Sequence, residues 1–271
     1  MGYSHREISQ LTAFAEELAR GAGRILKDGF KKGLKIDYKG RINPVTDYDL
    51  KSERYITSRI SRRFPEHDIL AEEGSDVEKQ STYRWIIDPL DGTVNYAHGF
   101  PVYCVSIALE YDTDIVLGVV YDPERDELFS ARRGKGARLN RRRIKVSRER
   151  ILRRSLLATG FAYNVATAHR NNLGLFARLV KKAQAVRRPG SAAIDLCWLA
   201  EGRLDGFWEF YLHPWDTAAA KLVVEEAGGK VTRINGQPYS VFAPDILATN
   251  GFLHRTMISV LNEKRPGRRR S

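Results

Sequence analysis

Two aspartates three residues apart, Asp88 and Asp91, follow a short apolar run and are the strongest chemical feature of this sequence. The run at residues 85–87 is aromatic and β-branched, which predicts a buried strand. Pro89 fixes its own backbone torsion and favours an extended path for Asp88, and Gly92 permits a sharp turn. We therefore expect two hard oxygen ligands at a strand end, followed by backbone N–H groups that could face an anion.

Further acidic residues also lie where an element begins or ends. Glu72 and Glu73 follow an expected strand at residues 69–71, and Asp216 lies where a helix is expected to begin. Each segment has an ordinary structural explanation: a turn for Asp-Pro-Leu-Asp-Gly, a solvated loop for Glu72 and a helix N-cap for Asp216. Together, however, the carboxylates are what a site for several Mg²⁺ ions requires, and the scattered histidines show no zinc-ligand spacing.

Two expected helix starts could hold an anion beside these carboxylates. Thr93 follows Gly92 and is expected to be a helix N-cap, and Gly190 and Ser191 precede a second expected helix. Small residues there allow a ligand to approach the backbone N–H groups, although capping by Ser191 alone would explain the pattern equally well. Carboxylate-bound Mg²⁺ next to such a helix start suggests a phosphoester substrate.

The elements that must position these residues follow from apolar periodicity and turn signals. Helices are expected at residues 7–27, ended by Gly29 and Gly33, and at 46–64 with Leu50 among its buried positions, joined by a polar link at 35–44. Strands are then expected at 69–71, 85–87, 103–111, 115–121, 127–131 and 144–146, with an exposed basic hairpin at 132–143. From residue 155 the pattern alternates, with strands at 155–159, 185–187, 205–209, 230–233 and 246–249 and helices at 172–182, 191–201, 217–227 and 252–262. This change predicts a domain boundary near residues 147–153.

Composition places the chain among ordinary globular proteins. Its 271 residues are 42% hydrophobic and 29% charged, without an apolar run of the roughly 20 residues that span a bilayer. Cys104 and Cys197 lie in apolar segments, so we expect reduced core residues in a cytosolic protein and exclude a secreted disulfide scaffold.

The chain has a net charge of +12, and its lysines and arginines are concentrated at residues 132–143 and in the tail. A polyanion-binding surface is possible, but a solvated hairpin and tail are favoured.

Five segments, taken together, resemble the inositol monophosphatase family: IIDPLDGTVNY, LAEEG, PVTDYD, PGSAAIDLCWLAEGRLDGFWE and HPWDTAAAKLVVEEAGG. They occur in the family's order over nearly the whole chain. The resemblance implies an α/β (α+β) fold, a layered αβαβα sugar-phosphatase sandwich with mixed and antiparallel sheets. It further implies an N-terminal α+β domain at residues 1–150, a C-terminal α/β domain at 151–263 and a basic tail at 264–271, which we expect to be disordered.

The resemblance also implies the roles of individual residues. The implied Mg²⁺ ligands are Glu72, Asp88, the Leu90 carbonyl, Asp91 and Asp216, with Glu73 close by. Thr93 and Asp49 match the pair that orients an attacking water, and Glu72 is expected to assist catalysis. Substrate contacts are implied for Asp91, Gly92, Thr93 and Asp216 near the phosphate, and for Gly190, Ser191, Ala192 and Glu209 near the sugar or polyol.

The implied reaction is Mg²⁺-dependent hydrolysis of myo-inositol 1-phosphate by direct attack of water, with two or three Mg²⁺ per active site. Lithium inhibition and a homodimer follow by the same resemblance, and the cytoplasmic location is expected from the cysteines. Fructose-1,6-bisphosphate (alone or as a second substrate), histidinol phosphate and 3′-phosphoadenosine 5′-phosphate remain alternative substrates. Arg187 or Arg188 could bind a second phosphate, although surface charges on a strand end explain them as well. A nucleic-acid or protein-binding module that uses the basic surface is the non-enzymatic alternative, and no membrane partner is expected.

Overall fold

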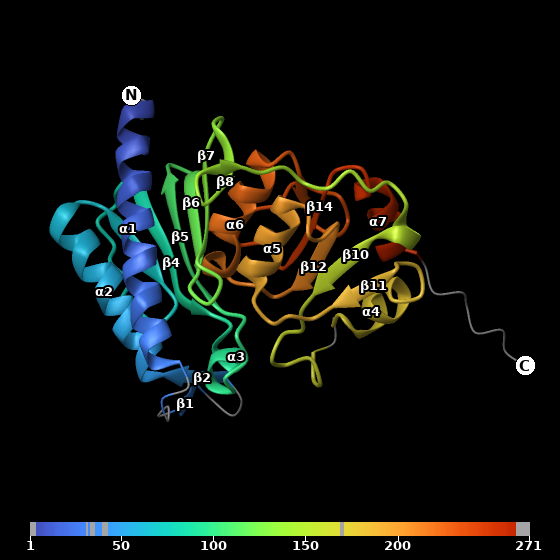
Figure 1. Ribbon diagram of the computed structural model, residues 1–271, viewed down its shortest axis with the longest axis horizontal. Coiled ribbons are helices and arrows are strands. Elements are labelled where there is room, and N and C mark those ends of the chain that lie inside the picture. Colours follow the sequence, from blue (N-terminus) through green and yellow to red (C-terminus); the bar gives the residue numbers. More distant parts are fainter. Residues whose placement is uncertain (1–3, 31, 33–35, 40–42, 169–170, 264–271) are drawn as a thin grey trace, which may run out of the picture.

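The chain folds into five alternating layers of helix and sheet (Figure 1). This computed structural model describes residues 4–30, 32, 36–39, 43–168 and 171–263. The layers are α1 (His5–Gly29) with α2 (Asp47–Arg63), a seven-stranded sheet, α5 (Ala192–Glu201) with α6 (Pro214–Glu226), a five-stranded sheet, and α4 (Leu173–Leu179) with α7 (His254–Leu261). The predicted αβαβα sandwich with mixed and antiparallel sheets is confirmed.

The seven-stranded sheet follows chain order. Its strands are β3 (Asp68–Ala71), β4 (Tyr83–Asp91), β5 (Cys104–Tyr111), β6 (Asp114–Asp122), β7 (Glu127–Arg132), β8 (Gly136–Leu139) and β9 (Arg142–Arg143). Only the β3–β4 pair is parallel, so the expected antiparallel meander is confirmed. The expected strand at 144–146 is wrong, because the Val146 N–H donates to the Ala227 carbonyl and the chain leaves the sheet there.

Strand β4 is longer than expected, and this difference positions the carboxylates. The sequence predicts that the strand ends at Ile87, but it continues through Pro89 to Asp91, with a bulge between the two aspartates. Strand β3 pairs only as far as Ile87, so one edge of β4 is free beyond that point. Proline lacks a backbone N–H and is tolerated at such an edge or at a bulge. The bulge therefore places both aspartates inside the strand rather than after it.

The five-stranded sheet has the spatial order β11 (Ala185–Arg187), β10 (Leu156–Thr159), β12 (Gly206–Phe210), β14 (Asp245–Thr249) and β13 (Lys230–Thr232). The first three strands are parallel, and β14 and β13 run antiparallel to their neighbours. Helices α5 and α6 pack between the two sheets, and one hydrophobic cluster joins residues of both. The division into domains at residues 1–150 and 151–263 stays a prediction, and the tail at 264–271 lies outside the described residues.

Several local expectations need correction. The link expected at 35–44 contains a hairpin of β1 (Ile36–Lys39) and β2 (Asn43–Thr46). Helix α1 ends at Gly29, but Phe30 follows with a negative φ of −58°, so no left-handed glycine ends it; Gly33 lies outside the described residues. Leu50 is 36% exposed, because the buried face of α2 carries polar residues instead. Helix α4 is four residues shorter than expected, and short segments α3 (Thr93–Ala97) and η1 (Leu152–Arg154) complete the fold.

Candidate active site

A cleft of about 730 Å³ gathers the residues that the sequence singled out. It is lined by the end of β4, the start of α3, the starts of α5 and α6, and the end of β12. All eleven residues expected to bind metal or substrate line this cleft: Glu72, Asp88, Leu90, Asp91, Gly92, Thr93, Gly190, Ser191, Ala192, Glu209 and Asp216. Asp49 is not among the lining residues and reaches the cleft through Thr93.

Three aspartates in the cleft each use one carboxylate oxygen to hold their own position. The Leu90 N–H donates to Asp88 Oδ1 at 3.0 Å, the Ser191 hydroxyl donates to Asp91 Oδ2 at 2.6 Å, and the His213 N–H donates to Asp216 Oδ2 at 2.7 Å. The second oxygen of each aspartate accepts no hydrogen bond from the described residues. The carboxylates are thus fixed in place while retaining a free ligand atom.

The acids in the cleft repel one another, and a bound cation would relieve this repulsion. Burial, together with the charges of Glu72, Asp91 and Asp216, raises the pKa of Asp88 well above its usual range. Burial and the charge of Asp91 raise the pKa of Asp216 to about 8. Hard carboxylate and carbonyl oxygens are the donors that Mg²⁺ prefers. Among the described residues no group of three acidic, His or Cys side chains already surrounds one point, but the chemistry of the donor atoms lining the cleft fits divalent cations.

One face of α2 positions the segments that carry these ligands. Asp49, Ser52 and Glu53 are spaced to share a helix face and are all buried. The Ser52 hydroxyl donates to the Pro89 carbonyl at 2.8 Å, and the Glu53 carboxylate accepts the N–H groups of Glu73 and Ser75. Helix α2 therefore fixes the bulge of β4 and the loop after β3 relative to each other, a role that the sequence analysis did not foresee.

Thr93 and Asp49 meet as the resemblance implies. The Thr93 hydroxyl lies 3.3 Å from Asp49 Oδ1 and 3.1 Å from the Leu90 carbonyl oxygen. Burial raises the pKa of Asp49 to about 6, although hydrogen bonds from Thr46 lower it. Thr93 is not the helix N-cap that we expected: Gly92 occupies that position with φ +95°, and a Cβ there would meet the Val102 carbonyl oxygen at 2.8 Å. Only glycine fits this turn without strain.

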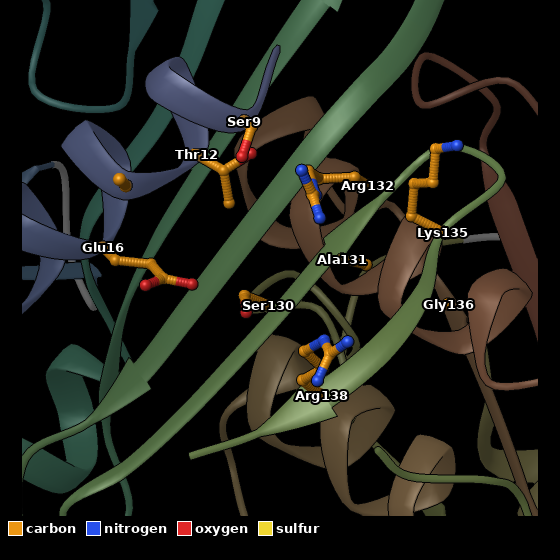
Figure 2. Close-up of a pocket in the computed structure, with 10 residues that line it drawn as sticks. Ser9, Thr12, Glu16, Ser130, Ala131, Arg132, Lys135, Gly136 and Arg138 are labelled. Carbon is orange, nitrogen blue, oxygen red and sulfur yellow. The ribbon is translucent and has the colours of Figure 1, made fainter. Parts of the chain in front are cut away.

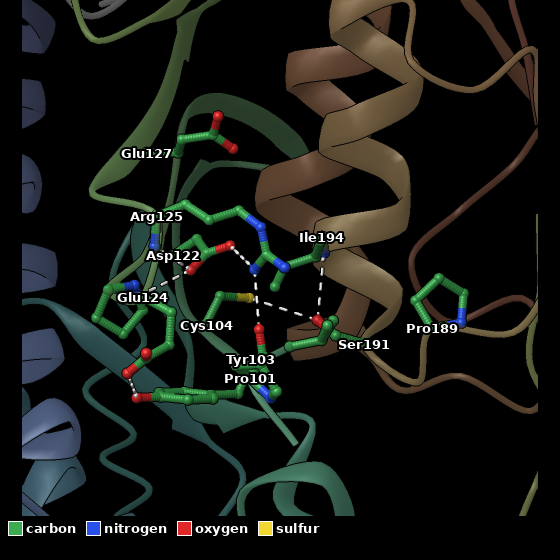
Figure 3. Close-up of polar contacts among 12 residues, drawn as sticks. Pro101, Tyr103, Cys104, Asp122, Glu124, Arg125, Glu127, Pro189, Ser191 and Ile194 are labelled. Carbon is green, nitrogen blue, oxygen red and sulfur yellow. Dashed lines mark hydrogen bonds and ion pairs between the residues drawn. The ribbon is translucent and has the colours of Figure 1, made fainter. Parts of the chain in front are cut away.

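The start of α5 binds a carboxylate of the protein itself. Asp91 Oδ2 accepts the Ala193 N–H at 2.8 Å as well as the Ser191 hydroxyl. Figure 3 shows Ser191 between the Cys104 thiol and the Ile194 N–H, which donates to the Ser191 oxygen. Both cysteines are free and buried, as predicted. The anion that the helix start was expected to attract is therefore, in part, Asp91.

Asp216 lies in the first turn of α6 rather than at its N-cap. The helix begins at Pro214, three residues earlier than expected, and His213 occupies the N-cap position. Proline is favourable at the first helical position because its missing N–H has no helical partner there. Starting the helix at Pro214 places Asp216 on a rigid turn that faces the cleft.

Several lining residues were missed by the sequence analysis. The segment after β10, including Phe161, Tyr163 and Asn164, forms one wall, and Asp195 of α5 also lines the cleft. Arg188 lines the cleft, whereas the guanidinium of Arg187 donates to its neighbour's carbonyl. The alternation of side chains along an extended segment predicts that only one of the two arginines faces the cleft, and Arg188 is the one that lines it. No pattern marked the aromatic segment.

A second, smaller hollow of about 190 Å³ lies between α1 and the β7–β8 hairpin. Figure 2 shows Arg132, Lys135 and Arg138 around it, with Glu16 on the facing helix. None of these three cations forms an ion pair with the described residues. The hollow is basic and contains no carboxylate cluster, so its chemistry differs from that of the cleft.

Comparisons with known proteins agree with this geometry. The model of the inositol monophosphatase family matches residues 7–265. The chain is 44% identical to the inositol-1-monophosphatase of Synechocystis sp. over 96% of this chain and 91% of the relative. It is 40% identical to the putative Nus factor SuhB of Neisseria meningitidis over 93% and 97% of the two chains. The structure of inositol monophosphatase from Anabaena superposes with a TM-score of 0.87 at 42% identity, covering 96% and 98% of the chains. No helix in the described part of the chain is long and apolar enough to cross a membrane.

Proposed function

This chain belongs to the inositol monophosphatase family and is a phosphoric monoester hydrolase, and we propose that it hydrolyses myo-inositol 1-phosphate with Mg²⁺ as cofactor. The observation that carries this proposal is the convergence of four carboxylates, the Leu90 carbonyl and the Thr93–Asp49 pair on one cleft. The family is generally metal-dependent. Mg²⁺ is proposed because every available donor is a hard oxygen atom.

Glu72, Asp88, Asp91, Asp216 and the Leu90 carbonyl would hold two or three Mg²⁺ ions. When bound, these ions would stabilise the charge that develops on the phosphate and make water a stronger acid. The Thr93 hydroxyl donates to Asp49, so its lone pairs are free to accept a hydrogen bond from a water molecule in the cleft. With a pKa of about 6, Asp49 is mostly ionised at neutral pH and can take up the proton through Thr93. Asp88 and Asp91 are committed to metal, so no covalent phosphoenzyme is proposed.

The substrate is proposed to lie between α3 and α5. Backbone N–H groups at Gly92 and Thr93 would contact the phosphate, and Asp91 and Asp216 would lie against it through their metals. Gly190, Ser191, Ala192 and Glu209 would contact the polyol. Asn95 supports this arrangement, since its amide donates to both the Val102 and the Pro189 carbonyls at 2.8 Å and so ties α3 to the segment before α5.

A phosphate-release screen tests the proposal. Purified protein with Mg²⁺ should release phosphate fastest from myo-inositol 1-phosphate among four substrates that include fructose-1,6-bisphosphate, histidinol phosphate and 3′-phosphoadenosine 5′-phosphate. EDTA should abolish the release, and lithium should inhibit it. If phosphate is released faster from another of the four compounds, that compound replaces myo-inositol 1-phosphate as the proposed substrate. Release that EDTA does not affect would reject the proposed dependence on Mg²⁺.

Fructose-1,6-bisphosphate has one structural observation in its favour. Arg188 lines the cleft, and a guanidinium can bind a second phosphate through two hydrogen bonds. Arg188→Ala should therefore raise KM for the bisphosphate more than for inositol phosphate. Arg187→Ala is the matched control, because that side chain is exposed and does not line the cleft. Equal effects of Arg188→Ala on both substrates would rule out a second-phosphate site.

The basic hollow supports a second, non-catalytic candidate function, binding of a nucleic-acid backbone. Unpaired arginines and a lysine attract phosphates through a salt-dependent interaction, and a relative of this chain is named a putative Nus factor. Replacement of Arg132, Lys135 and Arg138 by Ala should then weaken binding of a labelled RNA oligonucleotide without changing phosphatase activity. Binding that is equally weak before and after the replacement would reject this function.

Assembly and location are proposed by analogy with the family. A homodimer predicts about twice the monomer mass in solution, which light scattering measures directly. A cytoplasmic location agrees with two buried free thiols, because a reducing compartment keeps such cysteines unpaired.

A further inference from the structure

Asp195 is a buried carboxylate for which the proposed mechanism has no use. It lines the cleft from the first turn of α5 and is only 2% exposed. Its Oδ1 atom is buried without any hydrogen-bond partner, and its side chain accepts no hydrogen bond from the described residues. A buried acceptor without a hydrogen-bond partner destabilises the protein, because it has lost its hydrogen bonds to water and gained none in return. A ligand or ordered water must therefore satisfy it.

Capping of α5 does not explain this residue. The Ala193 N–H donates to Asp91, the Ile194 N–H donates to the Ser191 hydroxyl, and the Asp195 N–H donates to the Ser191 carbonyl. The donors of the first turn are thus already paired with other groups. An acidic residue there is favoured by the helix dipole, but that effect does not require burial against a cleft.

Glu209 of β12 is a second carboxylate beside Asp195. It is 8% exposed and lines the same cleft, and its charge acts on Asp195. Its carboxylate packs over Gly160, where the Cβ of any larger residue would overlap the carboxylate atoms. Burial raises the pKa of both acids well above the usual range, although the positive charge of Arg188 lowers it. The pair therefore favours a neutral ligand rich in hydroxyl groups, which can donate to one carboxyl and accept from the other.

We infer that Asp195 extends the polyol site already proposed for Glu209 into a hydroxyl-binding subsite, in which Asp195 accepts a hydrogen bond from the leaving alcohol and selects polyhydroxylated esters over esters of apolar alcohols. This inference rests on the proposed phosphatase function and adds Asp195 as a specificity-determining residue. The metal ligands are not part of the subsite. Changes at Asp195 should therefore affect the choice of alcohol and leave the chemistry at the phosphate unchanged.

Two esters that differ only in the alcohol test this inference: myo-inositol 1-phosphate and phenyl phosphate, whose leaving group carries no additional hydroxyl. Asp195→Leu should raise KM for the inositol ester on the order of tenfold, the loss expected for one hydrogen bond to a carboxylate, and leave kcat/KM for phenyl phosphate unchanged. Asp195→Asn retains one acceptor oxygen and should restore part of the affinity. Because an unpartnered acid is replaced by an apolar side chain, the melting temperature of the Leu variant should not fall.

Equal loss on both esters, or no change on either, would overturn the inference. A direct binding measurement separates this failure from failure of the proposed function. Saturation-transfer NMR with free myo-inositol should show binding to the wild-type protein and none to Asp195→Leu. If the wild-type protein hydrolyses neither ester, the phosphatase proposal fails. In that case the saturation-transfer signal of myo-inositol is the only test of the subsite. A signal that is present with the wild type and lost in Asp195→Leu supports the subsite. A signal that is absent with the wild type, or that persists in the variant, rejects it.

Discussion

At the residue scale, Asp49 shows how burial and hydrogen bonding can adjust one carboxylate for proton transfer. Removal from water favours the neutral acid, whereas two hydrogen bonds from Thr46 favour the anion, and burial prevails to give a pKa of about 6. An exposed acid with an ordinary pKa would be a weaker base. The contact with the Thr93 hydroxyl directs this base toward the cleft.

Asp49→Asn tests this role. We expect kcat to fall about 10²–10⁴-fold, the usual contribution of a general base, with little change in KM. Asp47→Asn is the control, because Asp47 is an exposed acid in the same first helical turn. If both variants retain wild-type kcat, the buried acid serves only to begin the helix.

At the element scale, helix α2 holds together two ligand-bearing segments that are far apart in the sequence. Glu53 fixes the loop that carries Glu72, and Ser52 fixes the bulge between Asp88 and Asp91. A helix interior is rigid, so its side chains determine the spacing of the segments that carry the proposed metal ligands. The polar buried face of α2 is thus part of the site rather than a defect of the core.

Glu53→Gln should weaken this support, since an amide has one acceptor oxygen for the two N–H groups that Glu53 now binds. We expect the Mg²⁺ concentration for half-maximal activity to rise on the order of tenfold, as for loss of a group that orients metal ligands. The activity at saturating Mg²⁺ should be nearly retained. Glu66→Gln, an exposed change just beyond the helix, is the control, and an unchanged Mg²⁺ requirement of Glu53→Gln would contradict the proposed support.

Most helices and strands could be predicted from the sequence, and the residues implied as ligands do line one cleft. The predictions were wrong where contacts with other elements determine the end of a strand or the burial of a side chain. The end of β4 could not be placed, because Pro89 is tolerated only after β3 has stopped pairing. Leu50 was expected inside on apolarity alone, but the buried positions in the first half of α2 are taken by Asp49, Ser52 and Glu53. Asp195 lies inside one of the segments that resemble the family, but nothing in that segment indicates a buried, unpartnered acid, and residues 161–164 match no motif. Only the folded chain therefore shows that both line the cleft.

At the scale of the whole molecule, two sheets and the helices between them confine several negative charges in one cleft. The folded protein binds protons on these acids more tightly than the unfolded chain does, because their pKa values are raised. Their contribution to stability is therefore greatest at low pH and is lost as the pH rises from the ordinary value of 3.8 toward about 8. Bound cations should reverse this loss by replacing the protons.

Thermal unfolding at several pH values checks this account. In EDTA, the melting temperature of the wild type should fall between pH 5 and pH 8 by more than that of Asp216→Asn, which lacks one repelling charge. Addition of Mg²⁺ should raise the wild-type value most at the higher pH. A wild type and variant with the same pH dependence would show that Asp216 does not have the raised pKa on which this argument depends.

The proposal that the carboxylates of β4 hold the catalytic cations can be tested by measuring phosphate release by Asp88→Asn. Asp88 is buried at 1% exposure and is held by the Leu90 N–H, so the isosteric change should preserve the fold. At saturating Mg²⁺, release from myo-inositol 1-phosphate should fall on the order of 10³-fold or more, corresponding to loss of several kcal/mol of charge stabilisation. Circular dichroism and the melting temperature should show a folded protein. Near wild-type release by this folded variant would contradict the account.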